Sequence, residues 1–311
     1  MKILNLSVFV LCFSAKAQTI TETFGSGTNI FSIDFVAVGN PGNLADTSGW
    51  GSVSYTFLMG KYEITQGQIT KANTLGGLGL DFSNWSTIGA NGPNYPAGGI
   101  NWFEAAKFVN FLNTSRGLSP AYKFDSGGKF QTWTVNDVGY NPANPYRNSG
   151  AQFWLPSGHE WHKAAFGSPQ GTWYDYPTGS DTKPTGVSQG TDPGTAIYNG
   201  VPGPAPVELS GGPSAWGTFG QGGNVYEWEE TSADASNSNP DAARAIRSGS
   251  WNMGELALAA SSSYRNINFG PQATVSDFGF RVAGVPEPSS PSLLLAGGAV
   301  LLVLRPKRQM K

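Results

Sequence analysis

The sequence of 311 residues contains one cysteine, Cys12. Cys12 lies in a segment with the order of a secretory signal peptide: a basic start, an apolar run over residues 3–13, and the small-x-small sequence that ends at Ala17. We expect cleavage after Ala17, in preference to an N-terminal core strand. Lipid attachment at Cys12 is disfavoured because Leu11 before it is not small. A mature chain without cysteine has no disulfide, no thiolate nucleophile and no cysteine metal ligand.

Charge is also scarce. Charged residues make up 13% of the chain and the net charge is −2, so no basic patch is available for nucleic acid, and nucleic-acid binding is not expected. Glycine (42), proline (21) and tryptophan (10) are abundant, which favours a loop-rich, aromatic globule over a helical bundle. We see no internal repeat.

The sequence has no long hydrophobic run, and its C-terminal apolar stretch, residues 292–304, is short of the ~20 residues of a membrane-spanning helix. Pro286-Glu287-Pro288 precedes this stretch and a basic tail follows it, which resembles the PEP-CTERM sorting signal of Gram-negative-type bacteria. The resemblance implies transient anchoring in the inner membrane, cleavage by an exosortase, and delivery to the outer surface or extracellular matrix. An ordinary C-terminal anchor is the alternative.

These signals divide the chain into three parts: a signal peptide (1–17, removed by signal peptidase), a domain (18–284) and a sorting segment (285–311). Within the domain, Thr65, Asn101 and Ser157 each precede a Gln or Glu by three residues, which is the capping-box pattern of a helix start. The predicted helices span residues 65–73, 101–113 and 157–166. Alternating apolar and aromatic residues predict strands at 31–38, 53–64, 245–251 and 278–283. One α+β domain accommodates these elements.

Six segments of the domain resemble, in order, the motifs of one family. They are MGKYEIT (59–65), the segment 96–112 with NWFEAA, WLPSGHEWHKAA (154–165), GNVYEW (223–228), RSGSW (247–251) and GFRV (279–282). This is the formylglycine-generating-enzyme, or sulfatase-modifying-factor, family. The resemblance covers residues from about 31 to 283 and implies an elaborated C-type-lectin-like α+β fold, rich in loops and with few short helices.

The family's enzymes oxidise a cysteine of a sulfatase with copper and dioxygen, and two cysteines hold the copper. Those positions correspond to about Met253 and Leu258 in this chain. A thioether is a weak ligand of Cu(I) and leucine is no ligand, so copper and catalysis of this oxidation are not expected.

Two other kinds of metal site have partial support in the sequence, and each has a structural alternative. His159 and His162 form an H-E-W-H sequence that is one residue short of the zincin motif, and a surface-helix reading is favoured. The family resemblance implies structural calcium at the carbonyls of Gly223 and Val225 and the carboxylate of Glu227, with Asn199 near a second site. The family's Asp or Asn three residues before the motif glycine is Gly220 here, and Glu227 as a buried hydrogen-bond partner is the alternative.

Three more residues complete the candidate set. Arg281 is expected in a structural ion pair, whereas Arg265 and Trp251 are candidates for contact with a glycan or peptide ligand. The expected function is a non-catalytic binding or structural module at the cell envelope or in the exopolysaccharide matrix. An oxidase or other metal-dependent enzyme of altered chemistry is the alternative.

Overall fold

The computed structural model describes residues 19–83, 91–255, 258–259 and 268–286. The predicted signal peptide, the apolar C-terminal stretch and Arg265 lie outside these ranges. None of the helices in the described ranges combines the length and the apolar character needed to cross a membrane.

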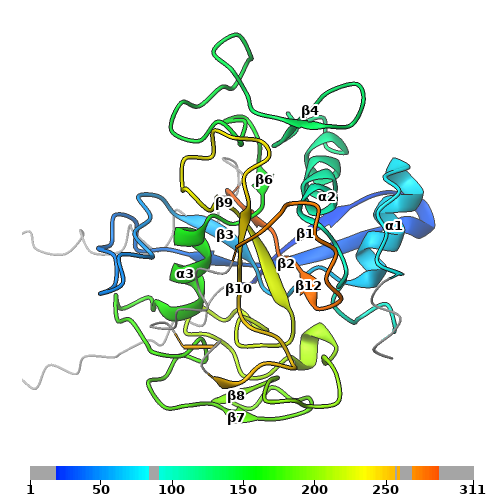
Figure 1. The fold of residues 1–311 in the computed structure, drawn as a ribbon. Coiled ribbons are helices and arrows are strands. Elements are labelled where there is room, and N and C mark those ends of the chain that lie inside the picture. Colours follow the sequence, from blue (N-terminus) through cyan, green and yellow to red (C-terminus); the bar gives the residue numbers. More distant parts are fainter. Residues whose placement is uncertain (1–18, 84–90, 256–257, 260–267, 287–311) are drawn as a thin grey trace, which may run out of the picture.

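Two antiparallel-rich sheets and three α-helices organise the described residues (Figure 1). The first sheet has the order β1 (Thr19–Phe24), β2 (Phe31–Val38), β3 (Phe57–Gly60), β13 (Ala283–Gly284) and β6 (Phe153–Trp154). The second sheet has the order β11 (Asn268–Phe269), β10 (Arg244–Arg247), β9 (Tyr226–Ser232) and β12 (Phe278–Gly279). Two small sheets pair β4 (Lys123–Phe124) with β5 (Phe130–Gln131), and β7 (Thr185–Gly186) with β8 (Thr195–Ala196). The two 3₁₀ turns described are η1 (Gly27–Asn29) and η3 (Val207–Leu209). This is the loop-rich α+β fold that the sequence predicts.

The three predicted helix starts are confirmed. The helices are α1 (Gln66–Gly76), α2 (Trp102–Thr114) and α3 (Gly158–Phe166), and each begins after a complete capping box. In each box the N-cap side chain accepts a hydrogen bond from the N3 backbone amide, and the N3 side chain accepts one from the N-cap backbone amide. α1 ends at Gly77, which takes the left-handed conformation (φ 58°) that glycine allows without a Cβ penalty. Local side-chain chemistry therefore sets where these helices begin.

The strand predictions are less accurate. Residues 31–38 form β2 as predicted, but only Phe57–Gly60 of the predicted strand 53–64 is strand. The strand predicted at 245–251 is β10, Arg244–Arg247, and it ends because Ser248 and Gly249 have positive φ angles of 92° and 74°. The segment 278–283 is two strands, β12 and β13, in different sheets.

The hydrophobic core lies between the first sheet and helices α1 and α2. Phe31, Phe108 and Phe111 pack against one another from β2 and α2, and α2 is covered by apolar contacts on most of its faces, as its sequence predicts. Trp102 is fully buried and its indole donates to the Glu229 carbonyl at 2.9 Å, which fixes α2 to β9. The two sheets are therefore joined through the aromatic side chains of α2.

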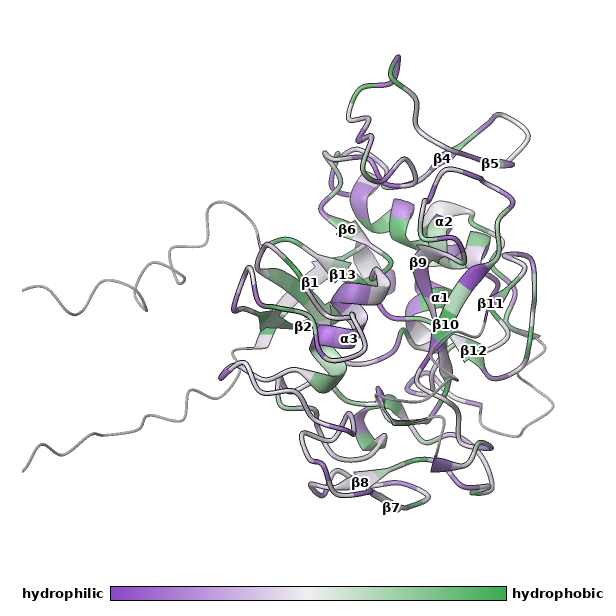
Figure 2. Cartoon of the chain, turned by 60° about the vertical axis from the view of Figure 1, so that its left-hand side comes forward, coloured by the Kyte–Doolittle hydropathy of each residue, from purple (hydrophilic) through white to green (hydrophobic). Residues whose placement is uncertain are grey.

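α3 differs from α2 because its polar side chains point into the protein. Figure 2 shows hydrophilic residues along α3, yet Glu160, His162 and Lys163 are all buried. Glu160 accepts from the Trp154 indole at 3.1 Å and from Tyr55 at 2.6 Å. These contacts fasten α3 to β6 and to the segment before β3.

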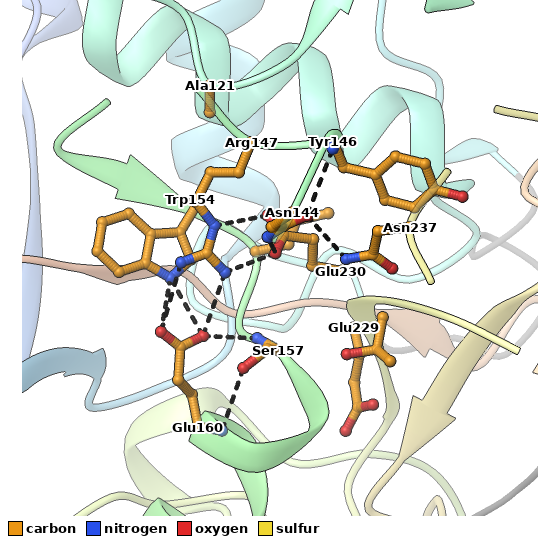
Figure 3. Close-up of polar contacts among 12 residues, drawn as sticks. Ala121, Asn144, Tyr146, Arg147, Trp154, Ser157, Glu160, Glu229, Glu230 and Asn237 are labelled. Atoms are coloured by element: carbon orange, nitrogen blue, oxygen red, sulfur yellow. Dashed lines mark hydrogen bonds and ion pairs between the residues drawn. The ribbon is translucent and has the colours of Figure 1, made fainter. Parts of the chain in front are cut away.

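A buried ionic network joins α3 to β9 (Figure 3). The Arg147 guanidinium donates to both oxygens of Glu230, at 2.8 and 2.6 Å, and lies 3.4 Å from the Glu160 carboxylate. Its plane lies over the Trp154 ring, 4.3 Å from the ring centroid. Tyr122 donates to Glu230 at 3.0 Å. One arginine thus serves as the shared counter-charge of two carboxylates that are fully shielded from water.

Replacing Arg147 with methionine tests this network. Arg147→Met leaves Glu160 and Glu230 buried without their counter-charge, so we expect a loss of about 3–5 kcal/mol in the free energy of unfolding. Urea denaturation measures the loss. Lys129→Met is the control, because Lys129 lies 3.8 Å from Asp241 with both side chains exposed, and it should leave the midpoint unchanged. Equal midpoints for the two variants would refute the role given to Arg147.

Candidate functional site

Backbone hydrogen bonds bring most of the predicted site residues together. The amide of Asn199 donates to the Met253 carbonyl at 2.7 Å, and the amide of Gly200 donates to the Trp251 carbonyl at 3.1 Å. Trp251 in turn donates to the carbonyl of Asn224 at 3.0 Å. The segment after β10 therefore lies against the loop around 199 and against the GNVYEW motif. Arg265 is outside the described residues.

Met253 and Leu258 occupy different environments. Met253 is partly buried and packs against the main core, whereas Leu258 is 1% exposed and packs with Ala196, Tyr198 and the partly buried Tyr176. Leu258 thus fills its position with an aliphatic side chain in an aromatic setting. These apolar contacts enclose the Leu258 side chain.

We call Tyr176, Lys183 and Glu255, together with the buried Leu258 against which Tyr176 packs, the Leu258 surface. The Lys183 ammonium forms an ion pair with the Glu255 carboxylate, and both side chains are exposed. Tyr176 is half-buried, and so is Trp251 on the neighbouring turn, where the indole nitrogen is buried and has no hydrogen-bond partner among the described residues.

Ser248 organises the turn below this surface. Its hydroxyl donates to the carbonyls of Gly220 and Gly223, at 3.1 and 2.9 Å, while the Gly223 amide donates to the same hydroxyl at 3.1 Å. Ser248 has a φ of 92°, a region that glycine enters freely and serine rarely does. The family motif R-G-G-S-W, which RSGSW resembles, has glycine at this place. Sequence analysis did not single out Ser248.

The Glu227 carboxylate accepts hydrogen bonds from two side chains of the protein. Arg281 donates to both Glu227 oxygens, from Nε at 2.6 Å and from a terminal nitrogen at 2.5 Å, and the Trp161 indole donates at 2.7 Å. All three side chains are essentially inaccessible to solvent. The structural ion pair expected for Arg281 is therefore present.

Gly223, Val225 and Glu227 do not form a ready cation site in this arrangement. The Glu227 carboxylate faces a guanidinium, and the Gly223 carbonyl accepts from Ser248. Within the described ranges no group of three or more His, Cys, Asp or Glu side chains could hold a metal ion. Calcium at these residues, or at Asn199, stays a prediction, and it requires Arg281 to release Glu227.

The two histidines point to different partners. The His162 ring lies 2.7 Å from the Asp46 carboxylate and is fully buried, whereas His159 is exposed and stacks on Trp50 with ring centroids 4.8 Å apart. Burial would raise the pKa of Asp46, but hydrogen bonds from His162 and Ser48 hold that pKa well below its usual range. The H-E-W-H sequence therefore serves to attach the segment before β3 to α3.

Glu63 is a buried acid that sequence analysis missed. It accepts from the Asn224 amide at 2.9 Å, and its second oxygen has no hydrogen-bond partner in the described structure. Burial raises the pKa of Glu63 to about 7; the Arg281 charge opposes this rise and the Glu227 carboxylate adds to it. A Cβ at Gly220 would lie 2.3 Å from the Glu63 carboxylate. The sequence carried one sign of this buried acid: Gly220 replaces the family's Asp or Asn. The Glu63 carboxylate occupies the space that a side chain at position 220 would need.

This burial predicts a pH dependence of stability. The folded protein binds the Glu63 proton more tightly than the unfolded chain, whose glutamate pKa is near 4.5, so the stability that Glu63 contributes falls as pH rises from 4.5 through 7. Glu63→Gln keeps the acceptor for Asn224 and removes the titration. The variant should gain on the order of 2 kcal/mol over the parent between pH 5 and pH 7.5, measured by urea denaturation.

The test compares the free energies of unfolding of the variant and the parent at each pH, so the contributions of other buried acids cancel. One of these acids is Glu229, whose pKa is also raised to about 7 by burial. Glu255→Gln, at an exposed pair, is the matched control and should show no such gain. A stability difference between Glu63→Gln and the parent that does not change with pH would contradict the buried titration.

The comparisons with known proteins agree with this architecture. The chain resembles variable protein 1 of Treponema denticola (20% identity, TM-score 0.60, covering 86% of this chain and 99% of that one). It also resembles the crystal structure of CarF (22%, 0.57, 82% and 99%) and PvdO from Pseudomonas aeruginosa (16%, 0.52, 85% and 98%). A search of the curated proteins finds no match. The sequence profile of the sulfatase-modifying factor enzyme 1-like domain matches residues 51–285. The chain therefore belongs to the family of that domain.

Proposed function

We propose that the protein is a non-catalytic binding module on the sulfatase-modifying-factor scaffold. The observation that carries this proposal is the packing of Leu258, which is 1% exposed against Ala196 and Tyr198. In the enzymes that the sequence resembles, a copper-binding cysteine stands at about this position. A buried aliphatic side chain cannot ligate copper, and the partner position is a methionine, Met253. The family's cysteine oxidation has no ligand pair here.

The Leu258 surface is the proposed binding face. Tyr176 and, on the neighbouring turn, Trp251 are only partly buried, and aromatic residues at such positions can pack on a sugar or an extended peptide. The Lys183–Glu255 pair supplies a donor and an acceptor beside them. Loops on a rigid base are common places for recognition, because the base fixes the loop ends. A glycan or peptide is the proposed ligand class.

The proposed location follows from the two terminal signals of the sequence. Export through the signal peptide, with sorting by the C-terminal segment, would bring the domain to the cell envelope or the exopolysaccharide matrix. A glycan ligand is consistent with that setting. An enzyme of altered, metal-dependent chemistry on the same scaffold is the alternative, and structural calcium remains part of the proposal.

Two measurements on the purified protein separate these functions. We expect no stoichiometric copper or iron and no consumption of dioxygen in the presence of thiol peptides, whereas a glycan array or an exopolysaccharide pull-down should show retention. Tyr176→Ala should weaken that retention at least tenfold, because it removes an aromatic face of the Leu258 surface. Tight binding of a redox metal together with dioxygen consumption would establish the enzyme reading instead.

Val138→Ala is the control variant for retention. Val138 is 91% exposed and is not part of the Leu258 surface. The variant therefore removes exposed apolar area and leaves the proposed binding residues unchanged. Retention that falls equally in both variants would show that the binding is nonspecific and would count against the proposal.

A further inference from the structure

A cavity lies between α3 and the segment that follows β2, and it shares no residue with the Leu258 surface. Its volume is about 240 Å³, and its walls include Lys163 of α3, Asn40 and Leu44 of the preceding segment, and Ser168, Thr172 and Trp173 after α3. In Figure 1 the segment after β2 lies beside α3, and the Asp46–His162 contact holds the two together. The cavity is thus built from elements that are fixed to each other.

Lys163 carries the only charge among the residues that line this cavity. Its ammonium donates to the Asn40 carbonyl at 2.8 Å, and within the described ranges no carboxylate lies at ion-pair distance from it. The residue is 1% exposed. Buried charges in proteins are normally paired, because removing an ion from water without a counter-charge is costly.

The Lys163 ammonium is only partly compensated by the groups around it. An ammonium has three N–H donors, and one carbonyl uses one of them. The last turn of a helix favours a cation, so the dipole of α3 gives Lys163 partial compensation. Burial nevertheless lowers the pKa of Lys163 to about 8, with no acidic group to oppose the shift. An incoming anion would supply the missing charge.

The remaining walls have the composition of a sugar site. Trp173 is half-buried, packs against Trp161 and Phe166, and lines the cavity together with the hydroxyl-bearing Ser168 and Thr172. The Ser168 hydroxyl, on a residue that is 3% exposed, accepts from the Thr172 amide at 3.0 Å. A ring with a few neutral polar groups suits a polyhydroxylated ligand, and the ammonium suits a single negative charge on it.

We propose that this cavity is a subsite for an acidic sugar, with the Lys163 ammonium pairing with one carboxylate or sulfate ester of the sugar and Trp173 packing on its ring. The site is separate from the Leu258 surface and does not depend on it. Binding here selects charged polysaccharides, whereas the Leu258 surface has a charge pair that is already internally balanced.

The experiment titrates the purified protein at pH 6.5 with sodium glucuronate, glucose 6-sulfate and glucose, followed by saturation-transfer NMR and tryptophan fluorescence. Glucuronate, glucose 6-sulfate or both should bind at least tenfold more tightly than glucose, and the tighter of the two identifies the anionic group. Lys163→Met keeps the length of the side chain and removes its charge, so it should abolish this preference. Lys163→Arg should retain part of it.

Folding of the variants is checked by thermal denaturation. Lys163→Met removes an unpaired buried charge, so its Tm should not fall. Tyr176→Ala should bind glucuronate as the parent does, which distinguishes failure here from failure of the Leu258 surface. Equal affinity for glucose and the acidic sugars, or undiminished preference in a folded Lys163→Met variant, would overturn the proposal. So would acetate that competes as well as glucuronate, since the sugar would then add nothing.

Discussion

The structure depends on three glutamates of β9 and the three arginines that face them. Glu227 pairs with Arg281, Glu229 lies 2.6 Å from Arg247, and Glu230 pairs with Arg147. All three carboxylates are inaccessible to solvent. A buried ion pair adds little net stability over a well-packed apolar pair, but a broken one is costly, so such pairs penalise other arrangements of the chain. In a domain without disulfides, β9 can in this way fix its neighbours in register.

Arg281 shows how one pair joins both sheets. It stands between β12 of the second sheet and β13 of the first, donates to the Gly60 carbonyl at the end of β3, and holds Glu227 on β9. The chain must leave one sheet and enter the other around this side chain. The alternating apolar and aromatic residues of 278–283 predict a single strand, because periodicity indicates burial and does not indicate which sheet buries each residue.

The sequence predicted what local chemistry decides. Capping boxes located all three helices, and β2 was predicted at its observed bounds, because its alternation is long and regular. β9 was not predicted as a strand, since three glutamates in seven residues read as a solvated segment until their arginines are placed beside them. Glu63 was missed for a related reason: burial raises its pKa, and that burial is produced by residues such as Asn224 and Gly220, which lie more than 150 residues away in the sequence.

Three other buried charged residues, Arg244, Glu63 and Lys163, are compensated in different ways. Within the described residues, Arg244 has no carboxylate at ion-pair distance but lies over the Trp102 and Tyr146 rings, 4.5 and 4.2 Å from their centroids. Glu63 can take up a proton, since its pKa near 7 makes the neutral form accessible. Among the described residues, Lys163 has neither an aromatic ring over its ammonium nor a carboxylate at ion-pair distance, and like Glu63 it lines a cavity. The Asn40 carbonyl and the dipole of α3 compensate the Lys163 charge in part, and the acidic sugar proposed for this cavity would supply the counter-charge that is missing.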